Sequence, residues 1–208
     1  MPNALAKLDD LKAALDLSGT DLDALLTRLL EDATATAARR VGLPTLMREA
    51  DIIEYPEPRR RGSAVVTLSR YPVEAIGTLK LAGYTTDSDG FAAIDSLTDE
   101  TDFIYGKAFG DIELLYGETF AAYPRANLVV YTAGYIDPAD AAPPAGAIQA
   151  PADLQRGIVL EATRLYNTRL DAGIDEVDAG KGGSHRPDVS GCHQALAQVC
   201  QGLRRVSL

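Results

Sequence analysis

The stretch AVVTLSRYPVEAIGTLKL, residues 64–81, decides the fold class. It contains two short runs rich in β-branched and apolar residues, 64–68 and 75–81, separated by turn residues that include a proline. Such runs with a turn between them are typical of antiparallel strands. Three more runs of this kind follow, at residues 102–105, 111–116 and 128–131. Residues 87–90 (DSDG) and 106–110 (GKAFG) are predicted to be turns between strands. The segment from about 49 to 136 is therefore predicted to form a small, mostly antiparallel β region.

The residues on either side of this region follow a helical period instead. Leucines spaced three and four residues apart predict a helix over 5–17, and a longer apolar stripe predicts a second over 20–41. Thr20 is expected to cap the second helix, which Gly42 ends. After a proline-rich connector, a third stripe predicts a helix over 151–172. We expect the apolar faces of the helices to pack together and on one face of the sheet.

These patterns predict an α+β fold. It consists of a helical bundle, with two N-terminal helices and one long C-terminal helix, and an inserted small antiparallel β region. Residues 1–173 are predicted to form a single domain. Residues 174–208 are expected to form a flexible C-terminal arm, because 175–191 are rich in Gly, Asp and Ser.

The end of this arm is apolar again, which predicts a docking segment that binds a partner chain. Its candidate contact residues are Leu196, Val199, Leu203, Arg204, Arg205, Val206 and Leu208.

The charge of the chain limits its partners. Thirty acidic and twenty basic residues give a formal net charge of −10, which opposes binding to a nucleic-acid backbone or an anionic membrane. The same charge suits a surface past which DNA slides, because like charges repel within the screening length. No apolar run approaches the roughly 20 residues of a membrane span, so the protein is expected to be soluble and made in the cytoplasm.

The sequence offers little for catalysis. Its two histidines, His185 and His193, both lie in the polar tail, where no fixed general base is expected. These two with Cys192 and Cys200 lack the close pairs that chelate zinc. We therefore predict no catalytic residue, no metal site and no cofactor. Whether Cys192 and Cys200 pair stays open.

One basic cluster stands out in the body of the chain: Arg59, Arg60 and Arg61, just after two prolines. A run of this kind is usually a solvated loop. The alternative is a contact with an acidic partner subunit or with a DNA phosphate.

Three stretches together resemble one protein family. Residues 68–76 (LSRYPVEAI) resemble an Arg-x-Pro-Val strand entry, and residues 130–135 (VYTAGY) resemble a Tyr-x-Ala-Gly-Tyr strand exit. Residues 151–169 resemble the helix that follows. This order is similar to that of the head-tail connector, or adaptor, proteins of tailed bacteriophages and of related gene-transfer-agent particles. The resemblance covers residues 5–172, and the chain departs from it around 82–101 and after Gly173.

The resemblance implies a non-enzymatic subunit of the virion neck. Adaptor proteins form a ring, typically a dodecamer, beneath the portal protein, where they extend the DNA channel. DNA passes through without sequence-specific binding, and the far side of the ring meets the stopper or tail-completion protein. The C-terminal segment would dock on the portal.

Two rival functions remain at this point. A stopper would share the acidic, ring-forming character, but stoppers resemble small β-barrels, so the helical frame favours an adaptor. An enzyme that uses a carboxylate pair and a metal predicts a cleft with converging acidic side chains.

Overall fold

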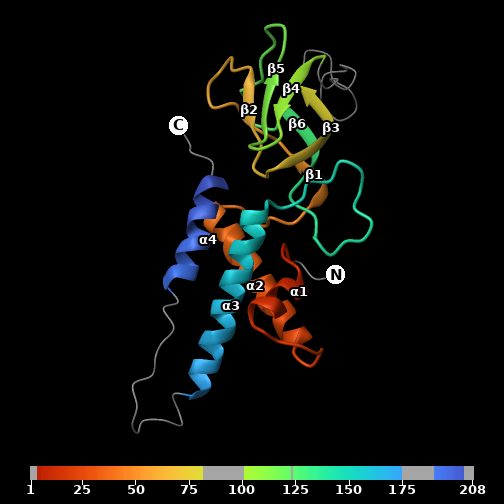
Figure 1. Cartoon of the computed structure of the whole chain (residues 1–208). Coiled ribbons are helices and arrows are strands. Elements are labelled where there is room, and N and C mark those ends of the chain that lie inside the picture. The colour runs from red at the N-terminus through yellow and green to blue at the C-terminus, as the bar shows by residue number, and fades with distance from the viewer. Residues whose placement is uncertain (1–3, 82–100, 123, 175–189, 204–208) are drawn as a thin grey trace. The chain divides into compact units, whose positions relative to one another are not determined.

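The computed structural model describes residues 4–81, 101–122, 124–174 and 190–203. The chain forms two compact units. The helical unit comprises residues 1–47, 136–143 and 149–208, and the β unit comprises 48–135 and 144–148. The predicted α+β class with a β region inserted between helices is confirmed (Figure 1). That residues 1–173 act as a single domain stays a prediction.

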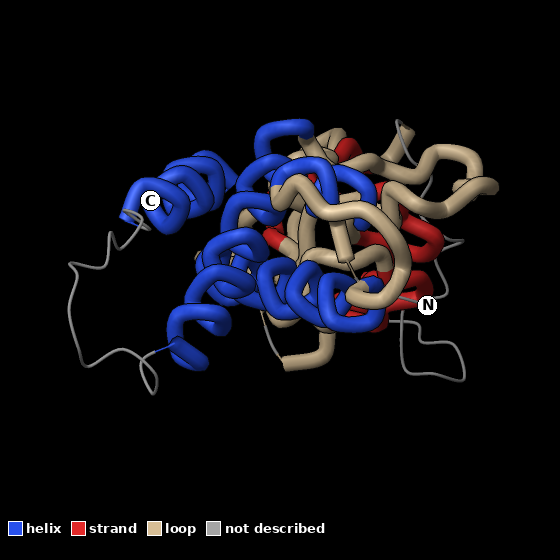
Figure 2. The backbone as a smooth tube through the Cα atoms, turned by 60° about the horizontal axis from the view of Figure 1, so that its bottom comes forward, coloured by secondary structure: helices blue, strands red, loops and turns tan. Residues whose placement is uncertain are grey.

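The described part of the helical unit contains four helices: α1 (Leu8–Ala14), α2 (Asp23–Val41), α3 (Ala152–Ile174) and α4 (Ser190–Leu203). Figure 2 shows these helices as blue tubes. Helices α1, α2 and α3 contact one another, and α4 contacts both α2 and α3. Apolar side chains spaced along the helices form the core: Leu11, Leu26, Leu30, Leu154, Ile158 and Ala162.

The first two helices begin later than predicted. Leu5 is buried outside α1, and its N–H donates to the Thr34 hydroxyl at 3.3 Å, so its place in the apolar pattern reflects burial of an irregular segment. Thr20 does not cap α2, because the helix begins at Asp23 and the side chain of its N-cap, Leu22, makes no capping bond. The predicted end at Gly42 is confirmed: this glycine has a left-handed φ of 87° and its N–H donates to the Ala38 carbonyl.

Over its described residues, the β unit forms two antiparallel sheets of three strands each. In the first, β6 (Asn127–Ala133) lies between β1 (Glu49–Glu54) and β3 (Val73–Leu81). In the second, β5 (Asp111–Leu114) lies between β2 (Val65–Thr67) and β4 (Phe103–Gly106). Strand β1 was not among the predicted strands.

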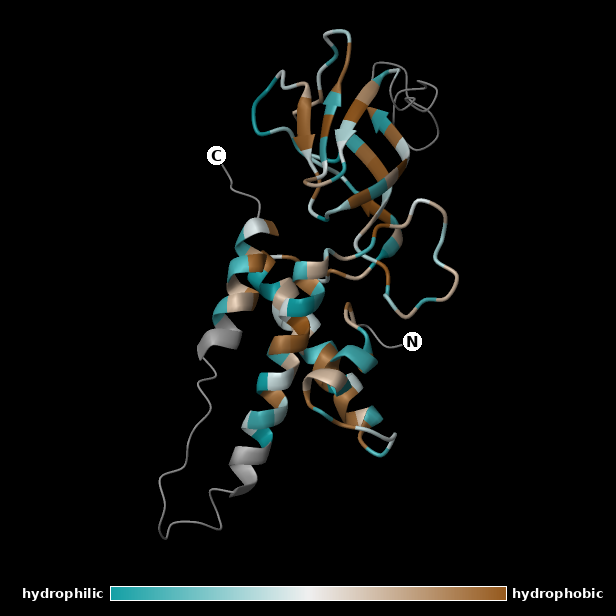
Figure 3. Cartoon of the chain, in the orientation of Figure 1, coloured by the Kyte–Doolittle hydropathy of each residue, from teal (hydrophilic) through white to brown (hydrophobic). Residues whose placement is uncertain are grey.

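The two sheets share one hydrophobic core. Its buried side chains include Val66, Phe103 and Ile112 from the second sheet, and Val73, Val129 and Tyr131 from the first. Figure 3 shows the hydrophobic residues as brown segments that alternate with polar ones along the strands. The two sheets thus form a core within the β unit itself. That the helices also pack on a face of a sheet stays a prediction.

The predicted turn at 106–110 is confirmed as the connection between β4 and β5. Gly110 has a φ of 67°, and a Cβ at this position would lie 3.1 Å from Val73 Cγ2 and 3.3 Å from the Arg70 carbonyl oxygen. Both the backbone conformation and the space therefore require glycine. The other predicted turn, at 87–90, lies outside the described residues.

Candidate interaction surfaces

The first candidate surface is the contact of α4 with the helices that precede it. Figure 1 shows α4 running back antiparallel along α3. Leu196 of α4 is fully buried and lies over Gly157 of α3. On the other side, Cys200 Sγ lies 3.9 Å from the Ala37 carbonyl oxygen of α2. We call this the α4 docking surface, defined by Ala37 and Gly157.

Glycine and alanine let α4 approach closely. A Cβ at position 157 would stand 3.1 Å from Leu196 Cδ1 and 3.5 Å from Leu196 Cα. The absence of a side chain at Gly157 therefore leaves the space on α3 that Leu196 of α4 occupies. Burial raises the pKa of the Cys200 thiol, and the charge of Arg40 opposes this shift in part.

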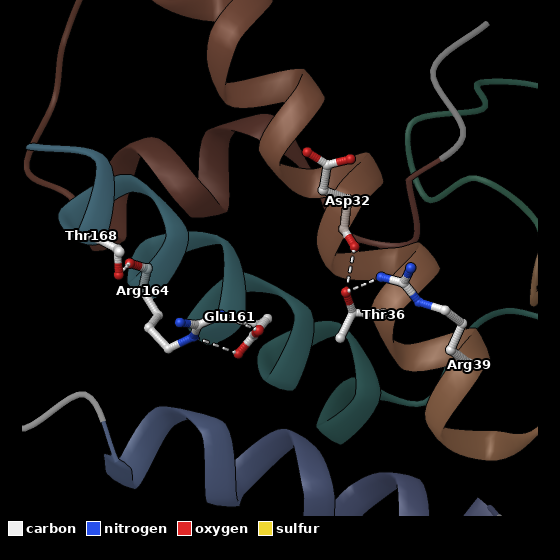
Figure 4. A network of polar contacts seen from close by, with 6 residues as sticks. All are labelled: Asp32, Thr36, Arg39, Glu161, Arg164 and Thr168. Atoms are coloured by element: carbon white, nitrogen blue, oxygen red, sulfur yellow. Dashed lines mark hydrogen bonds and ion pairs between the residues drawn. The ribbon is translucent and has the colours of Figure 1, made fainter. Parts of the chain in front are cut away.

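A buried ion pair stabilises α3 itself. The Glu161 side chain is only 2% exposed and accepts two hydrogen bonds from Arg164, at 3.1 and 2.7 Å (Figure 4). A carboxylate this deeply buried needs such a partner, because its desolvation is costly. The Thr168 hydroxyl donates to the Arg164 carbonyl one turn later.

The predicted docking residues fall into three groups. Leu196 is buried against Gly157 of the same chain, and its contact with a partner chain stays a prediction. Val199 and Leu203 are half-buried. The remaining four, Arg204, Arg205, Val206 and Leu208, lie outside the described residues. Cys200 is a free, buried thiol in this structure. The side chain of Cys192 lies outside the described residues.

The second candidate surface is the loop that carries Arg59, Arg60 and Arg61. All three side chains are exposed, in the connection between β1 and β2. The start of this loop is anchored by Asn127, which is buried and donates from Nδ2 to the Pro56 carbonyl at 2.9 Å and to the Ala121 carbonyl at 3.0 Å. The start of the loop is thus held to the β unit by this hydrogen bond.

Asn127 was missed by sequence reasoning. A lone asparagine at the start of an apolar strand looks like a surface residue. Its role in connecting the loops at Pro56 and Ala121 is visible only in the structure. A second contact fixes the same region, because the Arg125 guanidinium lies 4.9 Å from the centre of the Tyr55 ring.

The third candidate surface is a set of exposed apolar side chains on the β unit. Of the six large hydrophobic side chains that are exposed in the described part of the chain, five belong to this unit: Ile53, Val65, Ile104, Phe109 and Tyr116. Val65 and Ile104 both face Glu113 in the strand register, so they flank one carboxylate on the outer face of the second sheet. The pair formed by Val65 and Ile104 is a candidate contact surface for another protein, because adjacent exposed apolar side chains favour such contacts.

Polar contacts hold the strands of the first sheet in place. Arg48 donates two hydrogen bonds to Glu74, at 2.6 and 3.0 Å, and this contact raises the pKa of Arg48. The Tyr131 hydroxyl donates to Glu54 Oε2 at 2.6 Å, and the same carboxylate accepts bonds from the Ser69 N–H and hydroxyl. These hydrogen bonds connect the strands of the first sheet with the neighbouring loops.

Acidic side chains do not converge in the described residues. Within those ranges, no group of three or more His, Cys, Asp or Glu side chains is placed to hold a metal ion. None of the helices in the described part of the chain is long and apolar enough to span a membrane.

Comparison with solved structures gives the class of the fold. The chain is similar over its whole length to a chain in the neck of an empty GTA particle computed with C6 symmetry, with 18% identity and a TM-score of 0.56, covering 93% of that chain. It is also similar to a chain in the neck of a native GTA particle computed with C12 symmetry, with 19% identity, a TM-score of 0.50 and 92% coverage of that chain.

At these identities the likeness shows a shared fold. No protein-family model matches the sequence, and no curated protein matches it either. The fold of the whole chain is thus similar to that of chains in the necks of GTA particles.

Proposed function

We propose that this chain is an adaptor subunit of the neck of a tailed-phage or gene-transfer-agent particle. One observation carries the proposal: the similarity in fold extends over the whole chain and over 93% of a chain in the neck of a GTA particle. The work of such a subunit is binding, so no catalytic step is assigned to it.

The proposed assembly is a ring of identical copies, twelve by the family resemblance, that lies beneath the portal protein. The two similar neck structures were computed with C6 and C12 symmetry, which is compatible with a ring of twelve. A closed ring needs two different faces on each copy that fit each other. The exposed apolar side chains of the β unit and the loop of Arg59, Arg60 and Arg61 are the surfaces on which we expect these contacts.

The proposed ring extends the channel through which DNA passes. A net charge of −10 supports passage without tight binding, because a negative lining repels the phosphate backbone. The far side of the ring would bind a stopper or tail-completion protein. A stopper role for this chain itself is less well supported, because stoppers resemble small β-barrels and the described residues of this chain include four helices.

The portal contact is assigned to the end of the chain after α4. Deleting all of 190–208 would also remove Leu196 and Cys200 from the helical core. A loss of portal binding by that variant could therefore result from a loss of folding. A sharper test deletes only residues 204–208. We expect this variant to keep its helical content and to lose most of its binding to the portal.

The experiment is electron microscopy of the purified chain mixed with the portal protein of the same particle. A ring of this chain on one end of the portal is the expected result. The variant with Arg60→Ser and Arg61→Ser is expected to fold normally and to form fewer rings. Complete lack of a complex between the intact chain and the portal would contradict the proposal.

A further inference from the structure

The α4 helix is bound to the rest of the helical unit by apolar packing. Between Ser190 and Leu203 the sequence SGCHQALAQVCQGL contains no Asp, Glu, Lys or Arg. Leu196 and Cys200 are its buried side chains, and they meet Gly157 and Ala37. Every copy of the chain carries the same helix and the same docking surface, so the packing is equally favourable whichever copy supplies the helix.

The connection to α4 is longer than closure within one chain requires. At about 1.5 Å per residue, α3 extends roughly 25 Å beyond Gly157, and α4 begins roughly 9 Å before Leu196. With packed helices about 9 Å apart, the end of α3 and the start of α4 are separated by roughly 20 Å. Residues 175–189 can span up to about 50 Å.

The surplus length is enough to reach the next copy in a ring. Equivalent points on adjacent copies are separated by about one domain diameter, roughly 30 Å. That distance is within the reach of residues 175–189. Once a ring has formed, the docking surface of the neighbour is present at a high effective concentration, as is the chain's own.

We propose that in the assembled ring each copy places its α4 helix on the α4 docking surface of the adjacent copy. The partner that occupies the α4 docking surface is thus a second copy of this chain. Each copy in the ring is then connected to the next one by its α4 helix. This inference rests on the proposed function, because it requires a ring.

A disulfide between positions 157 and 196 distinguishes the two arrangements. A Cβ at position 157 lies 3.8 Å from Leu196 Cβ, which is the mean Cβ separation of natural disulfides. The variant carries Gly157→Cys and Leu196→Cys, with Cys192→Ser and Cys200→Ala to remove the natural thiols. Oxidation joins the two new thiols, and an added mild oxidant such as diamide accepts the two electrons and two protons.

The protein is assembled with the portal, ring formation is checked by electron microscopy, and the oxidised sample is run on a denaturing gel without reductant. Exchange predicts a ladder of covalent oligomers that extends to the complete ring and collapses to monomer on reduction. The same variant oxidised in dilute solution without portal is expected to run as a monomer and to have lost both free thiols in a maleimide-labelling assay, which shows that the bond itself can form.

A shortened variant provides the matched control. Deleting residues 178–185 leaves a connection of at most about 25 Å, enough for closure within one chain and too short for exchange. This variant is expected to give only monomers on the gel. Rings that contain only intrachain disulfides in the full-length variant would overturn the inference and leave the adaptor function intact. If no rings form at all, the proposed function fails and the inference with it.

Discussion

Leu196 of α4 fills the space that the missing side chain of Gly157 leaves in α3. The pair brings two helices so close that a Cβ at position 157 would lie 3.5 Å from the Leu196 backbone and 3.1 Å from its Cδ1 atom. A methyl group at 157 therefore needs a small adjustment of a flexible leucine. A branched side chain needs a shift of α4 itself.

The first prediction concerns this contact. Gly157→Val is expected to weaken α4 packing by about 1–3 kcal/mol, the usual cost of overpacking a well-filled site. In a Cys192→Ser background, the rate at which Cys200 reacts with a thiol reagent should rise about 5- to 150-fold, because burial keeps this thiol protected while α4 is docked. Gly202→Val is the matched control, since a Cβ at 202 would meet nothing within 4 Å. Equal reactivity of Cys200 in the two variants would show that the close approach of Leu196 to Gly157 does not control the packing of α4.

The second prediction concerns Leu196, the other residue of this contact. Leu196→Ala should lower the free energy of unfolding of the helical unit by about 2–5 kcal/mol, because it deletes a fully buried side chain and leaves a cavity. Hydrogen exchange of α3 amides measures the effect, and β6 amides are expected to be unchanged. Gln198→Ala, an exposed position on the same helix, is the control. Unaltered α3 protection in Leu196→Ala would contradict the packing described here.

The sequence predicts those elements whose burial has a simple period. Helices α2 and α3 carry long apolar stripes on one face, and the predicted strands carry runs of β-branched residues, so both were found. Strand β1 was missed because Glu49, Asp51 and Glu54 interrupt its apolar residues. An edge strand tolerates such charges, since only one side of it is paired.

The partners of buried residues are harder to predict than the elements. The apolar pattern marked residues 194–208 as a segment that orders on a partner chain, with Leu196 among its candidate contact residues. It did not show that α3 covers Leu196, because Gly157 and Leu196 are distant in the sequence. A glycine inside a helical pattern looks like a tolerated defect until the helix that packs on it is known.

The third prediction concerns the Arg48 and Glu74 pair. Glu74 is only 8% exposed, so Arg48→Met leaves its carboxylate poorly solvated and should lower the free energy of unfolding of the β unit by about 1–3 kcal/mol. The double variant with Glu74→Met should recover most of this loss, and urea unfolding measures both. Arg70→Met is the comparison: its partner Glu49 is 52% exposed, and the expected cost is below about 1 kcal/mol. Equal losses for the two arginines would show that burial of the carboxylate is unimportant.

The last prediction concerns pH. The Tyr131 side chain is 1% exposed, and burial, followed by its bond to Glu54, raises the pKa of its hydroxyl. A group whose pKa is raised on folding contributes stability that is fully present below the unfolded value, near 10 for tyrosine, and is lost as the pH rises through the folded value. Tyr131→Phe removes the titrating group. It should cost about 1–2 kcal/mol at neutral pH, because a hydrogen bond to a carboxylate is lost.

The decisive quantity is the difference in free energy of unfolding between the wild type and Tyr131→Phe, measured by urea unfolding from pH 7 to pH 11. This difference should stay constant up to about pH 9 and then shrink, since only the wild type must keep a buried tyrosine protonated. Tyr116→Phe is the matched control: Tyr116 is 86% exposed, and its substitution should leave the free energy unchanged across the whole range. A constant difference up to pH 11 would mean that the Tyr131 hydroxyl ionises as easily in the folded chain as in the unfolded one, which its burial against Glu54 argues against.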